Sequence, residues 1–173
     1  MAIKGASLYQ TLGNASNIRY DIIGKTSEVI AVGDPLTISS GVLKVVSATT
    51  DPIVGVAAAA STAAQNDGTR YVAYVPTDDT CIWLMGCVAD LTDNKTNGGT
   101  IYSLCSASTG SLSSATGAVQ VDVTAGVKTT TSMQVEIIKV DPRGIGGSGA
   151  NSGLREVLVK FVRTPSVGGI VTN

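Results

Sequence analysis

The chain has 173 residues, a net charge of −1 at pH 7 and no histidine; 43% of its residues are hydrophobic and 14% are charged. This length fits one domain with a substantial core, and high apolar content with low charge excludes a disordered chain. Lysine and arginine occur singly along the sequence, without the basic stripe of a nucleic-acid-binding protein. Without histidine, Ser-His-Asp and Cys-His catalytic arrangements are excluded.

The sequence also predicts a compartment. Residues 1–17 hold no apolar run of signal-peptide length, and no segment approaches the ~20 apolar residues of a membrane-spanning helix. The three cysteines are Cys81, Cys87 and Cys105, and they lack metal-ligand spacing. On one strand the first two would lie ~20 Å apart, too far for a disulfide. We expect buried reduced thiols, synthesis in a cytoplasm and no membrane contact.

Residues 1–26 mix Gly, Ser and Asn with isolated apolar residues and show no sustained period. One interpretation is an extended N-terminal arm that becomes ordered by lying on another surface. The other is an edge strand folded back on its own domain. Both interpretations stay open from the sequence.

From residue 27 to residue 163 the chain reads as a series of short β segments separated by Gly, Asp, Asn and Ser turns. Ser40-Gly41 is a two-residue hairpin signal between two of them. The predicted segments are 27–32, 35–39, 42–47, 52–59, 69–76, 80–89, 99–105, 118–123, 132–140 and 154–162. We predict an all-β fold, a single antiparallel β-barrel or β-sandwich of about nine short strands, followed by a C-terminal tail over 164–173.

Three local features refine this prediction. The segment 80–89 is apolar throughout, which predicts a central strand covered on both faces. In 154–162 the alternation places Arg155, Val157, Val159 and Phe161 on the inner face. Residues 57–65 and the stretch from Asp90 to Asn97 favour short helical turns, and no long helix is expected.

The stretch GIGGSG, Gly144 to Gly149, matches the G-x-G-x-x-G spacing of a dinucleotide-binding loop. That function requires a helix to open after the glycines, because the helix N-terminus holds the pyrophosphate. The sequence continues instead into the alternating strand 154–162. We interpret residues 143–153 as a Gly-rich hairpin loop, and we expect no bound cofactor.

Carboxylates and aromatics are the other candidates for a ligand site. Asp78 and Asp79 adjoin in the turn PTDDT, where Asp commonly bonds its own backbone; a calcium or paired-carboxylate site there is the alternative of a metal- or ligand-binding β-sandwich. Trp83 lies within an apolar strand, which favours core packing over ligand stacking. We expect no metal.

A longer pattern runs through the first half of the chain. Gly33, Asp34, Leu36 and Ile38 form a turn leading into a hairpin, and Val54 to Ala57 reads Val-Gly-Val-Ala before a further Gly-bounded strand. This succession resembles the small β-barrel decoration (cement) proteins of tailed-phage heads. The resemblance covers roughly residues 18–105 and consists of turns and strands rather than a catalytic signature.

The resemblance implies a structural virion protein that is not an enzyme. Such a protein binds the outer surface of the assembled capsid. Its partners are the major capsid protein and further copies of itself, with which it forms a homotrimer. It is made in the host cytoplasm and binds no nucleic acid directly. A head fibre, tail or pilus subunit is the alternative of the same class.

For the capsid or subunit interface we select the apolar residues of the arm, the Gly-rich loop and the tail. They are Leu8, Tyr9, Leu12, Ile18, Tyr20, Ile22, Ile145, Val167 and Ile170. For this role we predict that deletion of residues 1–24 leaves a folded barrel with lost or weakened shell binding.

Overall fold

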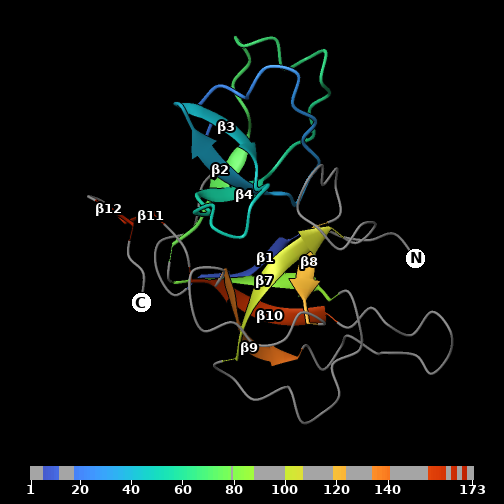
Figure 1. The fold of residues 1–173 in the computed structure, drawn as a ribbon, viewed down its shortest axis with the longest axis vertical. Helices are drawn as coiled ribbons and strands as arrows, with labels where there is room; N and C mark the ends of the chain where they lie inside the picture. The colour runs from blue at the N-terminus through green and yellow to red at the C-terminus, as the bar shows by residue number, and fades with distance from the viewer. Residues whose placement is uncertain are drawn as a thin grey trace, which may run out of the picture.

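The computed structural model describes residues 6–11, 18–78, 80–87, 100–106, 119–123, 134–140, 156–162, 165–166 and 169–170. The fold is all-β, as predicted, and these residues include no helix. A four-stranded sheet occupies the upper part of Figure 1 and a six-stranded sheet the lower part. Both are antiparallel throughout, in a sandwich-like arrangement.

The four-stranded sheet has the order β3-β2-β4-β5. Its strands are β2 (Pro35–Ser39), β3 (Val42–Val45), β4 (Gly55–Ala57) and β5 (Tyr74–Pro76). The predicted hairpin at Ser40-Gly41 is confirmed: Ser39 pairs with Val42, and the two loop residues have φ angles of 52° and 81°. Two positive φ angles in a two-residue loop give the turn whose twist matches that of the flanking strands.

A further segment lies beside this sheet and joins its two outer strands. We call residues 19–25 the strap. The strap forms isolated antiparallel bridges with Tyr71 and Tyr74 at the β5 side and a parallel bridge with Leu43 of β3. Backbone hydrogen bonds of 2.7–3.1 Å accompany these bridges, among them Arg19 N–H to the Tyr74 carbonyl and Leu43 N–H to the Ile23 carbonyl.

The six-stranded sheet has the order β1-β6-β10-β9-β7-β8. Its strands are β1 (Ser7–Thr11), β6 (Cys81–Gly86), β7 (Thr100–Ser106), β8 (Val119–Asp122), β9 (Val135–Val140) and β10 (Glu156–Phe161). An isolated bridge from Cys87, directly after β6, to Val121 of β8 brings the far edge back toward β6. The sheet is therefore strongly curled (Figure 1).

One hydrophobic core connects both sheets. Its largest buried side chains include Trp83, Phe161 and Leu36. The rings of Trp83 and Phe161 lie 5.7 Å apart between centroids with a tilt of 39°. Trp83 Nε1 donates a 2.9 Å hydrogen bond to Thr77 Oγ1, so the indole finds a polar partner at the junction of the sheets. Core packing of Trp83 is thus confirmed.

The strand faces follow the sequence pattern in one case and depart from it in another. Val157, Val159 and Phe161 of β10 are buried, as predicted, and Arg155 lies outside the described residues. β6 is an inner strand, between β1 and β10. This inner position is as predicted; however, its residues alternate between buried and half-buried, so the expected cover is complete on one face and partial on the other.

One other local prediction needs correction and one is confirmed. Residues 27–32 form no strand; within them only Ile30 makes a bridge, to Ser61. The short helical turn expected within 57–65 is present as a single turn at its end, closed by Asn66 N–H on the Thr62 carbonyl. The stretch 90–97 lies outside the described residues.

The segment expected as an arm has two described parts that both lie on the protein itself. Residues 7–11 form the edge strand β1, paired with β6, and residues 19–25 form the strap. The described parts therefore follow the second interpretation, a segment folded back on its own domain. Two short strands, β11 (Pro165–Ser166) and β12 (Gly169–Ile170), pair with each other in the expected tail.

Candidate interaction surface

Apolar side chains that face solvent gather on the N-terminal segment. Leu8 and Tyr9 of β1 are 38% and 44% exposed, although β1 is hydrogen-bonded to β6. The register of β1 shifts between Leu8 and Gln10. This bulge leaves Tyr9 without a directly opposite residue on β6, and bulges characteristically redirect a side chain at a sheet edge. The alternation of β1 is thereby broken, and two successive large side chains are partly exposed to solvent.

The strap region carries the second group. Ile18 and Tyr20 are 52% and 62% exposed, whereas Ile22 is half-buried and packs against the core. In an extended segment these three residues share one face, since side chains alternate with a period of two. The same row of side chains therefore begins in solvent and ends in the core. Large side chains exposed in this way are characteristic of a binding surface when they are contiguous.

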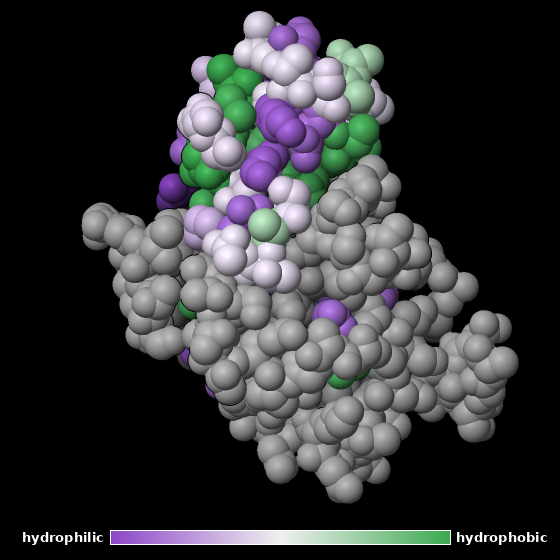
Figure 2. Space-filling view, viewed as in Figure 1, coloured by the Kyte–Doolittle hydropathy of each residue, from purple (hydrophilic) through white to green (hydrophobic). Residues whose placement is uncertain are grey.

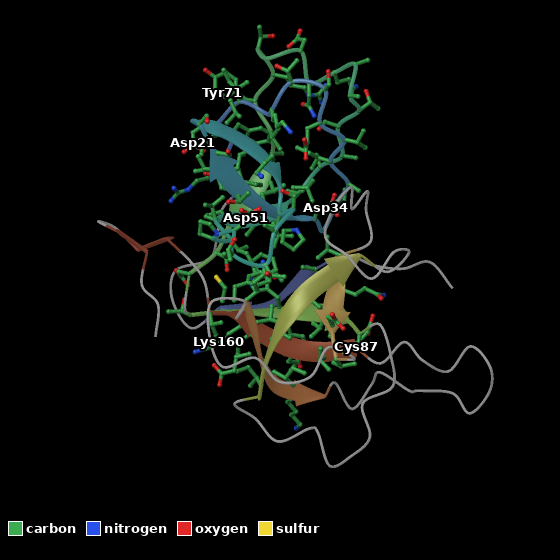
Figure 3. All side chains as sticks on the ribbon, in the orientation of Figure 1. Asp21, Asp34, Asp51, Tyr71, Cys87 and Lys160 are labelled. Atoms are coloured by element: carbon green, nitrogen blue, oxygen red, sulfur yellow. The ribbon has the colours of Figure 1, made fainter. Side chains whose placement is uncertain are left out.

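The other face of the strap carries the polar residues Arg19 and Asp21, and Asp21 has a local partner. The Tyr74 hydroxyl donates a 2.9 Å hydrogen bond to Asp21 Oδ1. Burial, and then the hydrogen bond and charge of Asp21, raise the pKa of Tyr74 above its ordinary value of 10.0, and Arg19 opposes this shift. The phenol therefore stays protonated at neutral pH and fastens the strap to β5. Asp21 and Tyr71 lie along the same side of the upper sheet (Figure 3).

The remaining interface candidates fall partly outside the described residues. Leu12, Ile145 and Val167 lie outside them, as does the whole Gly-rich loop 143–153. Ile170 is in β12, paired with Pro165. The structure thus brings Leu8 and Tyr9 together on β1, and Ile18, Tyr20 and Ile22 together on the strap.

Further exposed apolar side chains outside the arm were not predicted from the sequence. They are Val29, Val32, Ile38 and Tyr71. Figure 2 shows hydrophobic side chains on both flanks of the upper part of the molecule. Tyr71 lies opposite Ile23 of the strap. The sequence of the strap gives no indication of this pairing.

The acidic turn that could have formed a metal site has a local role. Asp78 Oδ1 accepts hydrogen bonds from the backbone N–H and hydroxyl of Thr80, at 2.8 and 2.7 Å. These bonds lower the pKa of Asp78. Asp79 lies outside the described residues, within which no group of three or more metal-ligating side chains occurs. Asp67 Oδ1 likewise accepts hydrogen bonds from the backbone N–H and the hydroxyl of Thr69.

No family model, curated protein or solved structure matches this chain. Within the described residues, no helix is long and apolar enough to cross a membrane.

Proposed function

We propose that this protein is a structural virion protein that decorates the outside of an assembled phage head and stabilises it, without enzymatic activity. The observation that carries the proposal is the presence of exposed apolar side chains on two N-terminal segments, Leu8 and Tyr9 on β1 and Ile18 and Tyr20 in the strap region. Side chains of this kind supply binding energy when a partner removes them from water, at ~25 cal/mol per Å².

The framework residues of the resemblance also support the proposal. Gly33 has a φ of 87°, and the buried Asp34 carboxylate accepts a 2.8 Å hydrogen bond from Ala31 N–H. This turn leads into β2, which pairs with β4 through Pro35 opposite Val56 and Leu36 opposite Gly55. The quoted sequence pattern thus corresponds to one continuous structural unit of turn, hairpin and paired strand.

The partners follow from this role. The protein binds the major capsid protein and further copies of itself, as a homotrimer, at the virion surface. A capsid offers the same site many times, so modest burial per copy is multiplied by symmetry. Binding that is selective for the assembled shell stabilises the shell by linkage.

Co-sedimentation with phage heads stripped of resident copies tests the proposal. We expect the wild-type protein to bind, and the double variant Ile18→Ser/Tyr20→Ser to bind about tenfold more weakly, because interface anchors of this kind cost more than about 1 kcal/mol when truncated. Val32→Ser is the matched control, since Val32 is 59% exposed on a different loop. Fluorescence melting through Trp83 checks that each variant is folded.

The possible outcomes test the decoration role and the proposed contact surface separately. Wild-type protein that stays in the supernatant would reject the decoration role. Full binding by the double variant would reject the strap region as the contact surface. Electron microscopy of labelled protein on whole virions distinguishes copies spread over the head from copies on a fibre, tail or other appendage.

A further inference from the structure

The six-stranded sheet is nearly complete without its first strand. β6, β10, β9, β7 and β8 are paired in succession, and the bridge from Cys87 to Val121 returns β8 toward β6. β1 is added on the remaining edge of β6, opposite residues Cys81 to Leu84. Removing β1 would therefore uncover one strand edge and interrupt no other strand pairing.

β1 also contributes little to the hydrophobic core. Of its side chains with described burial, Ser7, Leu8 and Tyr9 are all exposed. Ala6, just before the strand, is the buried residue of this segment, and its N–H donates to the Gly33 carbonyl at 2.7 Å. β1 is thus bound to β6 much as an added peptide strand is, with main-chain hydrogen bonds supplying a large part of the attachment.

Exposed apolar residues lie at both ends of the connection from β1 to the strap. Residues 12–17 make this connection, and six residues span at most about 20 Å. Leu8 and Tyr9 precede it and Ile18 and Tyr20 follow it, so four of the eight large hydrophobic residues that are exposed in the described part of the chain flank this short connection.

We propose that the edge of β6 from Cys81 to Leu84 accepts residues Ser7–Thr11 of a second copy of this chain, in exchange for its own. The structure already shows that this strand fits the edge of β6, because β1 of the same chain pairs there. The net charge of −1 gives little electrostatic repulsion between copies. Exchange of an identical element is a low-cost route to association, and it stands independently of capsid binding.

Protein concentration decides whether β1 pairs with β6 of its own chain or with β6 of a second copy. A strand tethered by a short linker has an effective concentration in the millimolar range. Each copy therefore keeps its own β1 in dilute solution, and exchange becomes extensive when copies are concentrated to about 1 mM.

A native cysteine allows a direct test. Thr11 lies opposite Cys81, and directly opposite residues share a face of the sheet with Cβ atoms about 5 Å apart. Thr11→Cys should therefore form a disulfide with Cys81 under mild oxidation. An epitope-tagged Thr11→Cys/Cys81→Ala chain, which has no acceptor of its own, is mixed with untagged wild-type protein before oxidation. A covalent tagged–untagged dimer that is lost when the untagged chain carries Cys81→Ala then requires β1 of one copy on β6 of the other.

We expect this dimer to increase with protein concentration between about 0.01 and 1 mM, and to exceed by about tenfold the background of a tagged Cys81→Ala chain that lacks the new thiol. Intrachain disulfide in Thr11→Cys with no mixed dimer at about 1 mM would overturn the proposal. Should Thr11→Cys form no disulfide at all, Ser7→Cys and Leu84→Cys, carried on separate chains, provide the same test at another pair of opposite residues.

Discussion

Tyr74 illustrates how one side chain holds a segment in place. Its hydroxyl donates a hydrogen bond to the carboxylate of Asp21 in the strap. The raised pKa of Tyr74 favours the neutral phenol, which is the form that can donate. A group whose pKa is raised on folding stabilises the native state fully below its unfolded pKa. That contribution is lost as the pH rises through the folded value, since the phenolate must ionise while partly buried next to a carboxylate.

We therefore predict that the free energy of unfolding falls above about pH 10, the ordinary pKa of tyrosine, more steeply in the wild type than in Tyr74→Phe. At neutral pH the substitution should cost about 1 kcal/mol, the usual net value of one hydrogen bond. Denaturant titrations at neutral pH and at several more alkaline values measure both effects. Parallel pH profiles for the two proteins would contradict the assignment.

Gly55 is a second residue whose identity is dictated by its surroundings. A Cβ at this position would lie 2.5 Å from the Val75 carbonyl oxygen and 2.6 Å from Tyr74 Cδ2. The first of these atoms is backbone of the paired strand β5 and cannot rotate away. β4 and β5 can therefore keep their observed separation here only with glycine.

Gly55→Ala is accordingly expected to destabilise the protein by about 1–3 kcal/mol, the typical cost of forced overpacking. Gly41→Asn is the matched control: Gly41 has a φ of 81°, a Cβ added there would meet no atom within 4 Å, and Asn tolerates that conformation. Melting followed by Trp83 fluorescence compares the two. A Gly55→Ala protein that melts with the control would show that the strands separate easily.

At the scale of elements, the strap and β1 differ in how deeply they are built into the fold. The strap links β3 to β5 through backbone hydrogen bonds on both sides and packs Ile22 on the core. β1 is an edge strand whose described side chains face outward. The simple expectation that residues 1–24 can be removed without loss of fold therefore needs revision at the strap.

Two truncations separate these roles. Deletion of residues 1–11 should leave a cooperative melting transition, because only one edge strand is lost. Deletion of residues 1–24 should lower the stability much further or abolish the transition, since Leu43, Val72 and Tyr74 lose backbone partners and each unsatisfied buried group costs about 1–3 kcal/mol. Equal melting temperatures for the two truncations would refute this division.

Those elements whose signals are local could be predicted from the sequence. Ser40-Gly41 determines its own turn, and the alternation of Val157, Val159 and Phe161 identifies the buried face of β10. The strap could be predicted only in part. Ile18, Tyr20 and Ile22 alternate with Arg19 and Asp21, which is a local strand signal, but its hydrogen-bond partners, from Leu43 to Tyr74, lie far along the chain.

The same limit applies to the candidate surface. Leu8, Tyr9, Ile18 and Tyr20 were identified as apolar residues in a segment without a period, and they are exposed. The bulge at Tyr9 depends on the register with β6, which no local pattern encodes. Tyr71 was missed because its bridge to Ile23 joins residues far apart in the sequence, so no local pattern places it at the surface.

At the scale of the whole molecule, the order of the strands sets the order in which the fold can be completed. All strands of the four-stranded sheet, and the strap, lie before residue 77. β10, by contrast, is the last long strand in the chain, yet it lies inside the larger sheet between β6 and β9.

During synthesis the first sheet can assemble while the rest of the chain is still being made. β6 must wait, with one edge open, until Glu156–Phe161 has left the ribosome. The newly made chain therefore spends the translation time of about seventy residues, roughly 4–14 s at about 5–20 residues per second, with an apolar strand edge that a chaperone or a neighbouring nascent chain can bind first.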